Sequence, residues 1–243
     1  METTLDLDGS GPLPPFQGRC EFLPGGRNIT YIGHLNEEAT KVDGFEEKGS
    51  FVQVIHYGAA HNVIEALINQ SGQCSQKLGY ECKQSRLFNS PVENGSVFAP
   101  FGYWTSRQGQ IMDFWAGSEP GSYKCECGFV GACFEVDKWC NCDSGHDDWL
   151  WDGGEITQKQ FLPVKSLHFG DTGTPLDGKE GRFVYFCSAA SVATLSIFCC
   201  FLPPLLVPSR IEKANFSVLS HGISTKTKIK ADSMDVNTST SRK

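Results

Sequence analysis

The stretch from Cys125 to Trp151, CECGFVGACFEVDKWCNCDSGHDDWLW, constrains this chain most. It holds five of the eleven cysteines and three of the five tryptophans. Cysteines this dense hold short loops together through disulfides or through a metal ion. A zinc site usually takes two pairs of ligands, each pair with about two to four residues between its members. Here one residue separates Cys125 from Cys127 and Cys140 from Cys142, which favours disulfides over zinc.

Glycosylation sequons also favour disulfides, because they indicate an oxidising compartment. Asn28, Asn69 and Asn94 each begin an N-x-S/T sequence without proline in the middle position, so all three are predicted glycosylation sites. Glycosylation and disulfide formation both occur on the secretory route. We therefore predict no metal and no other cofactor, and we expect disulfides among eight cysteines of the main body. These are Cys20, Cys74, Cys82, Cys125, Cys127, Cys133, Cys140 and Cys142.

Charge divides the chain into an acidic body and a basic end. Residues 1–182 carry 14 Lys and Arg against 25 Asp and Glu, whereas residues 208–243 carry seven basic and three acidic residues. An acidic body repels phosphates, so no nucleic-acid partner is predicted. Neither a nucleophile motif near His56 and His61 nor a glycine-rich phosphate loop occurs, so we predict neither an enzyme nor a small-molecule substrate.

The first residues, METTLDLDGSGPL, lack the basic and apolar regions of a signal peptide. Cys20 also stands 54 residues from the next cysteine. We therefore expect the extracellular module to be N-terminally incomplete, with the partner of Cys20 upstream.

Periodicity predicts strands over residues 16–22, 28–35 and 51–57, which are rich in β-branched and aromatic residues. Residues 59–69 are predicted to form a helix whose apolar face is Val63, Ile64, Leu67 and Ile68.

Two groups of residues could form binding sites, but a structural role is predicted for each. The aromatic clusters around Trp104 and Trp115 are predicted to form core rather than a ligand platform. The carboxylates of Asp147, Asp148 and Asp152 are predicted to lie in a solvated turn rather than in a weak calcium site.

An apolar segment follows the main body. Phe183 to Val207 contains no charged residue, and the 20 residues before Pro203 are enough to cross a bilayer core of roughly 30 Å as a helix. Basic residues from Arg210 onward place the C-terminus in the cytosol and the body outside. This predicts a single-pass cell-membrane protein with an extracellular N-terminal body. In the alternative, the segment does not insert and the protein is secreted.

Five motifs occur in an order that resembles the fibrinogen-like region of the contactin-associated protein and neurexin-IV-like (Caspr) family. The resemblance covers about residues 4–183, and the combination of C-x-C-G with C-N-C-D makes it specific. The motifs are DLDGSGPLPPFQGRCEF, YECKQSRLFNSP, WAGSEPGSYKCECG, WCNCDSGHDDWLWDGG and FLPVKSLHFGDT.

The resemblance implies an α+β, fibrinogen C-terminal-like, disulfide-rich extracellular module over residues 1–182. A transmembrane helix over 183–207 and a disordered basic tail over 208–243 would follow. It also implies a non-enzymatic glycoprotein that acts in cell adhesion at cell junctions and binds contactin-like extracellular proteins. The alternative is a soluble fibrinogen-related lectin that binds glycan or acetylated ligands in a calcium-supported pocket using Trp104 and Trp115.

The chain departs from the family pattern in ways that limit the transfer. The laminin-G, EGF-like and discoidin-like domains are absent from this sequence, and the pattern is lost just after Phe183. We therefore expect a truncated fragment or isoform. The seven cysteines from Cys74 to Cys142 are an odd number, so at least one has no partner within that set.

Overall fold

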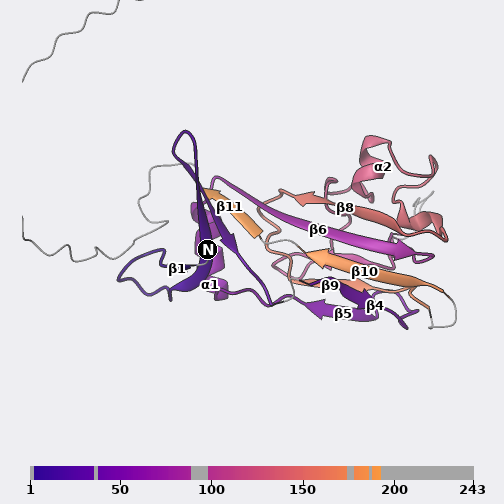
Figure 1. The fold of residues 1–243 in the computed structure, drawn as a ribbon, viewed down its shortest axis with the longest axis horizontal. Helices are drawn as coiled ribbons and strands as arrows, with labels where there is room; N and C mark the ends of the chain where they lie inside the picture. The colour runs from indigo at the N-terminus through magenta and orange to yellow at the C-terminus, as the bar shows by residue number, and fades with distance from the viewer. Residues whose placement is uncertain (1–2, 36–37, 89–97, 174–177, 186–187, 193–243) are drawn as a thin grey trace, which may run out of the picture. The chain divides into compact units, whose positions relative to one another are not determined.

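Antiparallel strands make up most of the fold in the computed structural model, which describes residues 3–35, 38–88, 98–173, 178–185 and 188–192 (Figure 1). The strands are β1 (Thr3–Leu5), β2 (Phe16–Leu23), β3 (Arg27–Ile32), β4 (Thr40–Val42), β5 (Phe51–Val54), β6 (Gln73–Lys83), β7 (Tyr103–Thr105), β8 (Leu150–Ile156), β9 (Ser166–Phe169), β10 (Glu180–Tyr185) and β11 (Ser188–Val192). The helices are α1 (His61–Gln70), α2 (Glu126–Val130) and the short 3-10 helix η1 (Cys142–Ser144).

The long strand β6 organises the larger sheet, whose order is β1-β2-β3-β11-β6-β10-β4, with β8 also paired to β6. The C-terminal part of β6 pairs with β10 and its N-terminal part pairs with β11. Leu78, Tyr80 and Cys82 alternate along β6 and are buried, as the two-residue period of a strand requires. In Figure 1, β6 runs between β8 and β10.

An aromatic stack joins the larger sheet to the smaller one, β5-β9-β7. The ring of Phe169, on β9, lies 4.4 Å from the ring of Tyr80 and 5.5 Å from that of Phe183, with near-parallel planes. All three side chains are buried. Stacked rings bury much apolar area per residue, so this contact places the core between the two sheets.

The predicted helix over residues 59–69 is confirmed as α1, and Val63, Ile64, Leu67 and Ile68 are its buried residues. The helix ends at Gln70, and the backbone N–H of the next residue, Ser71, donates to the carbonyl of Leu67. The predicted strands over 16–22, 28–35 and 51–57 correspond to β2, β3 and the shorter β5.

The α+β class overstates the helical content. The two α-helices of the described residues span ten and five residues, so this part of the chain is mostly β-sheet with several disulfides. In the cysteine-rich stretch, bridges between residues close in sequence hold short loops. The disulfide-rich character of the module agrees with the prediction.

A membrane helix that begins at Phe183 is wrong as far as Val192. Residues up to Tyr185 belong to β10, and Ser188–Val192 form β11. The reason is that backbone groups of this segment pair with β4, β6 and β3, and these strands satisfy the hydrogen bonds that a helix would make internally. Within the described residues no helix is both long and apolar enough to cross a membrane. The rest of the predicted span, 193–207, and the predicted tail, 208–243, lie outside the described residues.

Candidate functional site

Three disulfides fix the loops of the cysteine-rich stretch. They join six of the eight cysteines singled out from the sequence. The pairs are Cys82–Cys142, Cys125–Cys140 and Cys127–Cys133, separated in sequence by 60, 15 and 6 residues. The first ties η1 to β6, and the other two close the loops around α2. The stretch is therefore anchored to the central strand of the larger sheet.

A buried carboxylate, Asp152 of β8, holds the backbone next to these bridges. Its Oδ1 accepts a hydrogen bond from the N–H of Asn141 at 3.0 Å, and its Oδ2 accepts one from the N–H of Cys142 at 2.8 Å. The residue is only 2% exposed. Burial raises the pKa of Asp152 to about 7, although the two backbone hydrogen bonds act in the opposite direction.

Among the described residues, one group of three side chains has atoms close enough to hold a metal: Cys125, Cys140 and Asp152. The two sulfurs of this group are bonded to each other. Zinc is bound by thiolates, and a disulfide offers none, so the donor set does not fit a zinc ion.

Exposed large apolar side chains gather on the same stretch. Six of the eleven exposed large hydrophobic residues among the described residues lie between positions 129 and 151. We call this group the cysteine-loop surface; it comprises Phe129, Val130, Phe134, Val136, Trp149 and Trp151. Val136 is fully exposed and Phe134 is 59% exposed. Where exposed apolar side chains of a protein form a patch, that patch commonly marks a site of protein contact.

Trp151 lies flat on the larger sheet because two glycines leave room for it. Gly79 of β6 and Gly153 of β8 are paired across the strands, and a Cβ on either would overlap the indole ring. The side chain of Asn141 donates to the backbone carbonyl of Trp151 at 2.8 Å. The indole is 41% exposed, so it is held in place while one part faces solvent.

The neighbouring aromatic residues are also held by specific contacts. The guanidinium carbon of Arg182 lies 4.5 Å from the ring centre of Trp149. The ring of Phe134 meets the ring of His146 edge-on at 4.9 Å, and the N–H of Phe134 donates to Oδ1 of Asn141 at 2.8 Å. Aromatic residues that are already ordered lose little conformational entropy when they bind a partner.

A second buried carboxylate, Asp171, lies in a charged cluster. It accepts hydrogen bonds from Nε of Arg86 at 2.7 Å and from Nζ of Lys179 at 2.6 Å, and it is fully buried. Burial alone would raise the pKa of Asp171, but the hydrogen bonds from Arg86 and Lys179 outweigh it and lower the pKa below its ordinary value.

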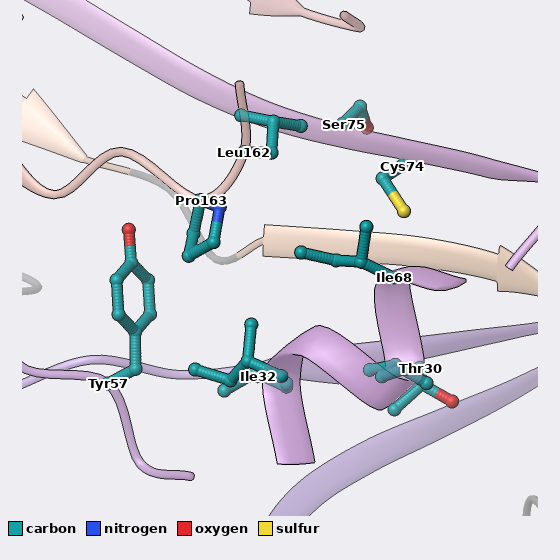
Figure 2. Close-up of a pocket in the computed structure, with 10 residues that line it drawn as sticks. Thr30, Ile32, Tyr57, Ile68, Cys74, Ser75, Leu162 and Pro163 are labelled. Carbon is teal, nitrogen blue, oxygen red and sulfur yellow. The ribbon is translucent and has the colours of Figure 1, made fainter. Parts of the chain in front are cut away.

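The remaining two predicted cysteines lie away from the bridges. The sulfur of Cys20, on β2, is 3.9 Å from Oγ1 of Thr30 on the paired strand β3. Cys74 is buried and forms no disulfide with any described residue. Figure 2 shows Cys74 beside Ile68 and Leu162 in the wall of an apolar cavity of about 30 Å³. Burial raises the pKa of the Cys74 thiol, which disfavours its reactive thiolate form.

The predicted glycosylation sites differ in their accessibility. Asn28 is partly buried on β3, and Asn69 is exposed in the last turn of α1. Ser71, the hydroxyl residue of the second sequon, is buried and donates to the carbonyl of Leu67 at 2.6 Å. Asn94 lies outside the described residues. Modification at all three remains a prediction.

The residues proposed for a lectin pocket do not form one. Trp104 and Trp115 are completely buried, and their indole nitrogens donate to the carbonyls of Phe114 and Asp152. The prediction that these tryptophans belong to the core is confirmed. Asp152 points into the protein, whereas the side chain of Asp148 is 88% exposed, so the three carboxylates do not converge on a cation.

The exposure of the cysteine-loop surface was not predicted from the sequence. In the sequence its residues form part of a cysteine-rich motif. A signal was present in the sequence, since Phe134 and Val136 fall between closely spaced cysteines, where loops are too short to bury every apolar side chain.

The sequence of this chain is similar to those of known proteins. No family model matches the chain. Neurexin-4 of Drosophila melanogaster is 57% identical over 183 residues, which are 75% of this chain and 14% of that protein. Contactin-associated protein 1 of Homo sapiens is 35% identical over 170 residues, 70% of this chain and 12% of that protein. The chain thus spans about one seventh of the first relative and about one eighth of the second. It belongs to the contactin-associated protein and neurexin-IV-like family.

Proposed function

We propose that this chain is a non-enzymatic recognition module that mediates extracellular protein contacts in cell adhesion at cell junctions. The observation that carries the proposal is the cysteine-loop surface. Six large apolar side chains are exposed there, within the stretch that three disulfides fix in place. Rigid, exposed aromatic residues are typical of the positions that dominate binding energy in protein interfaces.

Membership of this family supports an extracellular protein as the partner. One relative is named for its association with contactin, and this chain resembles only a part of that protein. A contactin-like ectodomain is therefore the first partner to test. The disulfides support an extracellular, oxidising location, and the predicted attachment to the cell membrane and glycosylation belong to the same proposal. The fibrinogen-like identity of the module remains a prediction.

A binding measurement with matched variants tests this function. The full chain, produced by secretion with its disulfides formed, is titrated with a contactin-like ectodomain by surface plasmon resonance. In the test variant, Phe134 and Val136 of the cysteine-loop surface are replaced by alanine. In the control variant, Phe22 and Val52, which are also exposed, are replaced by alanine.

The test variant is expected to weaken binding at least about tenfold, because a buried aromatic contact residue commonly contributes about 2 kcal/mol to an interface. The control variant is expected to bind as the unchanged chain does. Equal binding by all three proteins would remove the cysteine-loop surface as the contact site. No binding to any tested ectodomain of the class would remove the contactin-like partner.

A further inference from the structure

A second cavity, of about 480 Å³, lies outside the cysteine-loop surface. It is formed by the segment between β5 and α1, the loop after β7 and the segment before β9. Every charged or titratable lining residue except Tyr57 is basic: His56, His61, Arg107 and Lys165. No acidic residue lines it, although the body of the protein is acidic. Such a reversal of charge in a concave site favours an anionic ligand.

Arg107 is the most buried of these basic groups. Its side chain is 14% exposed. Its Nη1 atom is buried and has no hydrogen-bond partner among the described residues, and Oε1 of the half-exposed Glu65 is 3.9 Å away. A buried guanidinium nitrogen without an acceptor is costly to the fold. An anion in the cavity would supply that acceptor with a charge-assisted hydrogen bond.

Helix α1 adds positive potential at the same place. It begins at His61, and Ala59, His61 and Ile64 all line the cavity. The residue before the helix, Ala60, offers no side chain to cap it, and the first turn contains no acidic residue. The first N–H groups of a helix and its dipole favour a negative charge, and the first turn of α1 carries no acidic side chain to supply one.

The remaining wall is apolar and fixed. Ile55, Pro163 and Val164 line the cavity beside Tyr57. The hydroxyl of Tyr57 donates to the carbonyl of Val164 at 2.6 Å and accepts from Nε2 of Gln76 at 2.9 Å. Figure 2 shows Tyr57 and Pro163 standing side by side. Tyr57 and Ala59, the half-buried apolar lining residues, can therefore pack against the C–H face of a ring while the basic groups hold a charged substituent.

We propose that this cavity binds an acidic carbohydrate, with a carboxylate or sulfate held by Arg107 and the start of α1. The ring would pack on the half-buried Tyr57 and Ala59, and Lys165, His56 and His61 would surround the charged substituent. The cavity has the size of sites that enclose a small ligand, which favours one or two sugar rings over an extended acidic peptide. This site shares no residue with the cysteine-loop surface, so it can exist whether or not that surface binds a protein.

Ligand titrations of the full, oxidised chain test the proposal. Binding is followed by NMR chemical shifts at a salt concentration of about 20 mM, where charge interactions are weakly screened. Glucuronic acid tests the carboxylate and N-acetylglucosamine 6-sulfate tests the sulfate. Glucose and N-acetylglucosamine are the uncharged controls, and triglutamate tests an acidic peptide. Saturable binding of at least one acidic sugar is expected, with neither neutral sugar reaching saturation in the same range.

Substitutions locate the binding. Arg107→Gln is expected to weaken the acidic sugar about tenfold, and the exposed Lys165→Gln about threefold. Lys77→Gln, an exposed lysine of β6 that does not line the cavity, is expected to leave the affinity unchanged. Because Lys165 is exposed, its variant keeps the test valid if Arg107→Gln does not fold. The proposal is overturned if no acidic sugar binds, if neutral sugars or triglutamate bind as tightly, or if Lys165→Gln and Lys77→Gln behave alike.

Discussion

The disulfide Cys82–Cys142 should stabilise this fold much more than Cys127–Cys133 does. The two bridges join residues 60 and 6 positions apart. Closing a loop removes conformational entropy from the unfolded chain, and the loss grows with the logarithm of loop length. For these separations the entropy model gives about 4.3 kcal/mol for the longer loop and about 2.2 kcal/mol for the shorter one.

Two further features of the structure modify these values. The bridge Cys125–Cys140 lies inside the longer loop and shortens it by 15 residues, which lowers its contribution by only about 0.3 kcal/mol. Cys82 and Cys142 are 2% and 1% exposed, so removing their sulfur atoms also leaves a small cavity, which costs about 1 kcal/mol. The difference between the two bridges should therefore be about 2 to 3 kcal/mol in favour of Cys82–Cys142.

Urea unfolding of two double variants measures this difference. Cys82→Ala with Cys142→Ala is compared with Cys127→Ala with Cys133→Ala, each with its remaining bridges oxidised. Mass spectrometry under non-reducing conditions confirms the bridges before unfolding. We expect the first variant to lose about twice as much free energy of unfolding as the second. Equal losses, or a larger loss for the second variant, would refute the argument from loop length.

Three other substitutions test local features. Because burial raises the pKa of Asp152 to about 7, the folded state holds a proton that the unfolded state releases near pH 4. Stability should therefore fall as pH rises from about 4 to about 7, by on the order of 4 kcal/mol from this group, and Asp152→Asn should remove that slope in unfolding measured across the range. Gly79→Ala should displace the indole of Trp151, and acrylamide should then quench tryptophan fluorescence more strongly. The substitution should also lower the free energy of unfolding by about 1 to 3 kcal/mol. Gly58→Ala is its control, since a Cβ there would lie 3.4 Å from the nearest atom, and equal quenching would contradict the packing. Asp171→Asn should cost about 3 kcal/mol at neutral pH because two cations lose a buried partner; a loss below about 1 kcal/mol in chemical unfolding would contradict this.

Local patterns in the sequence predicted local features of the fold well. The apolar face of α1 follows from the spacing of Val63, Ile64, Leu67 and Ile68, because a helix brings those positions together wherever it packs. The burial of Trp104 and Trp115 also followed from their size and apolar character.

The segment after Arg182 shows where local reasoning failed. Residues 183–207 lack charge, and hydropathy alone predicts a spanning helix. Hydropathy does not report whether unpaired strand edges are available nearby. Here β6 offers its edge to β10 and then to β11, so part of the segment is sheet. That choice depends on strands more than 100 residues earlier in the chain.

The sequence alone was enough to predict that disulfides cross-link the module and to identify its family. The density and one-residue spacing of the cysteines favoured disulfides, and their order among neighbouring motifs identified the relatives. Which cysteines pair and which aromatic residues face solvent became known from the three-dimensional packing alone. Cys82 meets Cys142 because β6 and η1 come together, and Trp151 lies on the surface because Gly79 and Gly153 leave room for its ring. The contacts of Cys82 with Cys142 and of Trp151 with Gly79 join distant segments, and spacing along one segment cannot specify them.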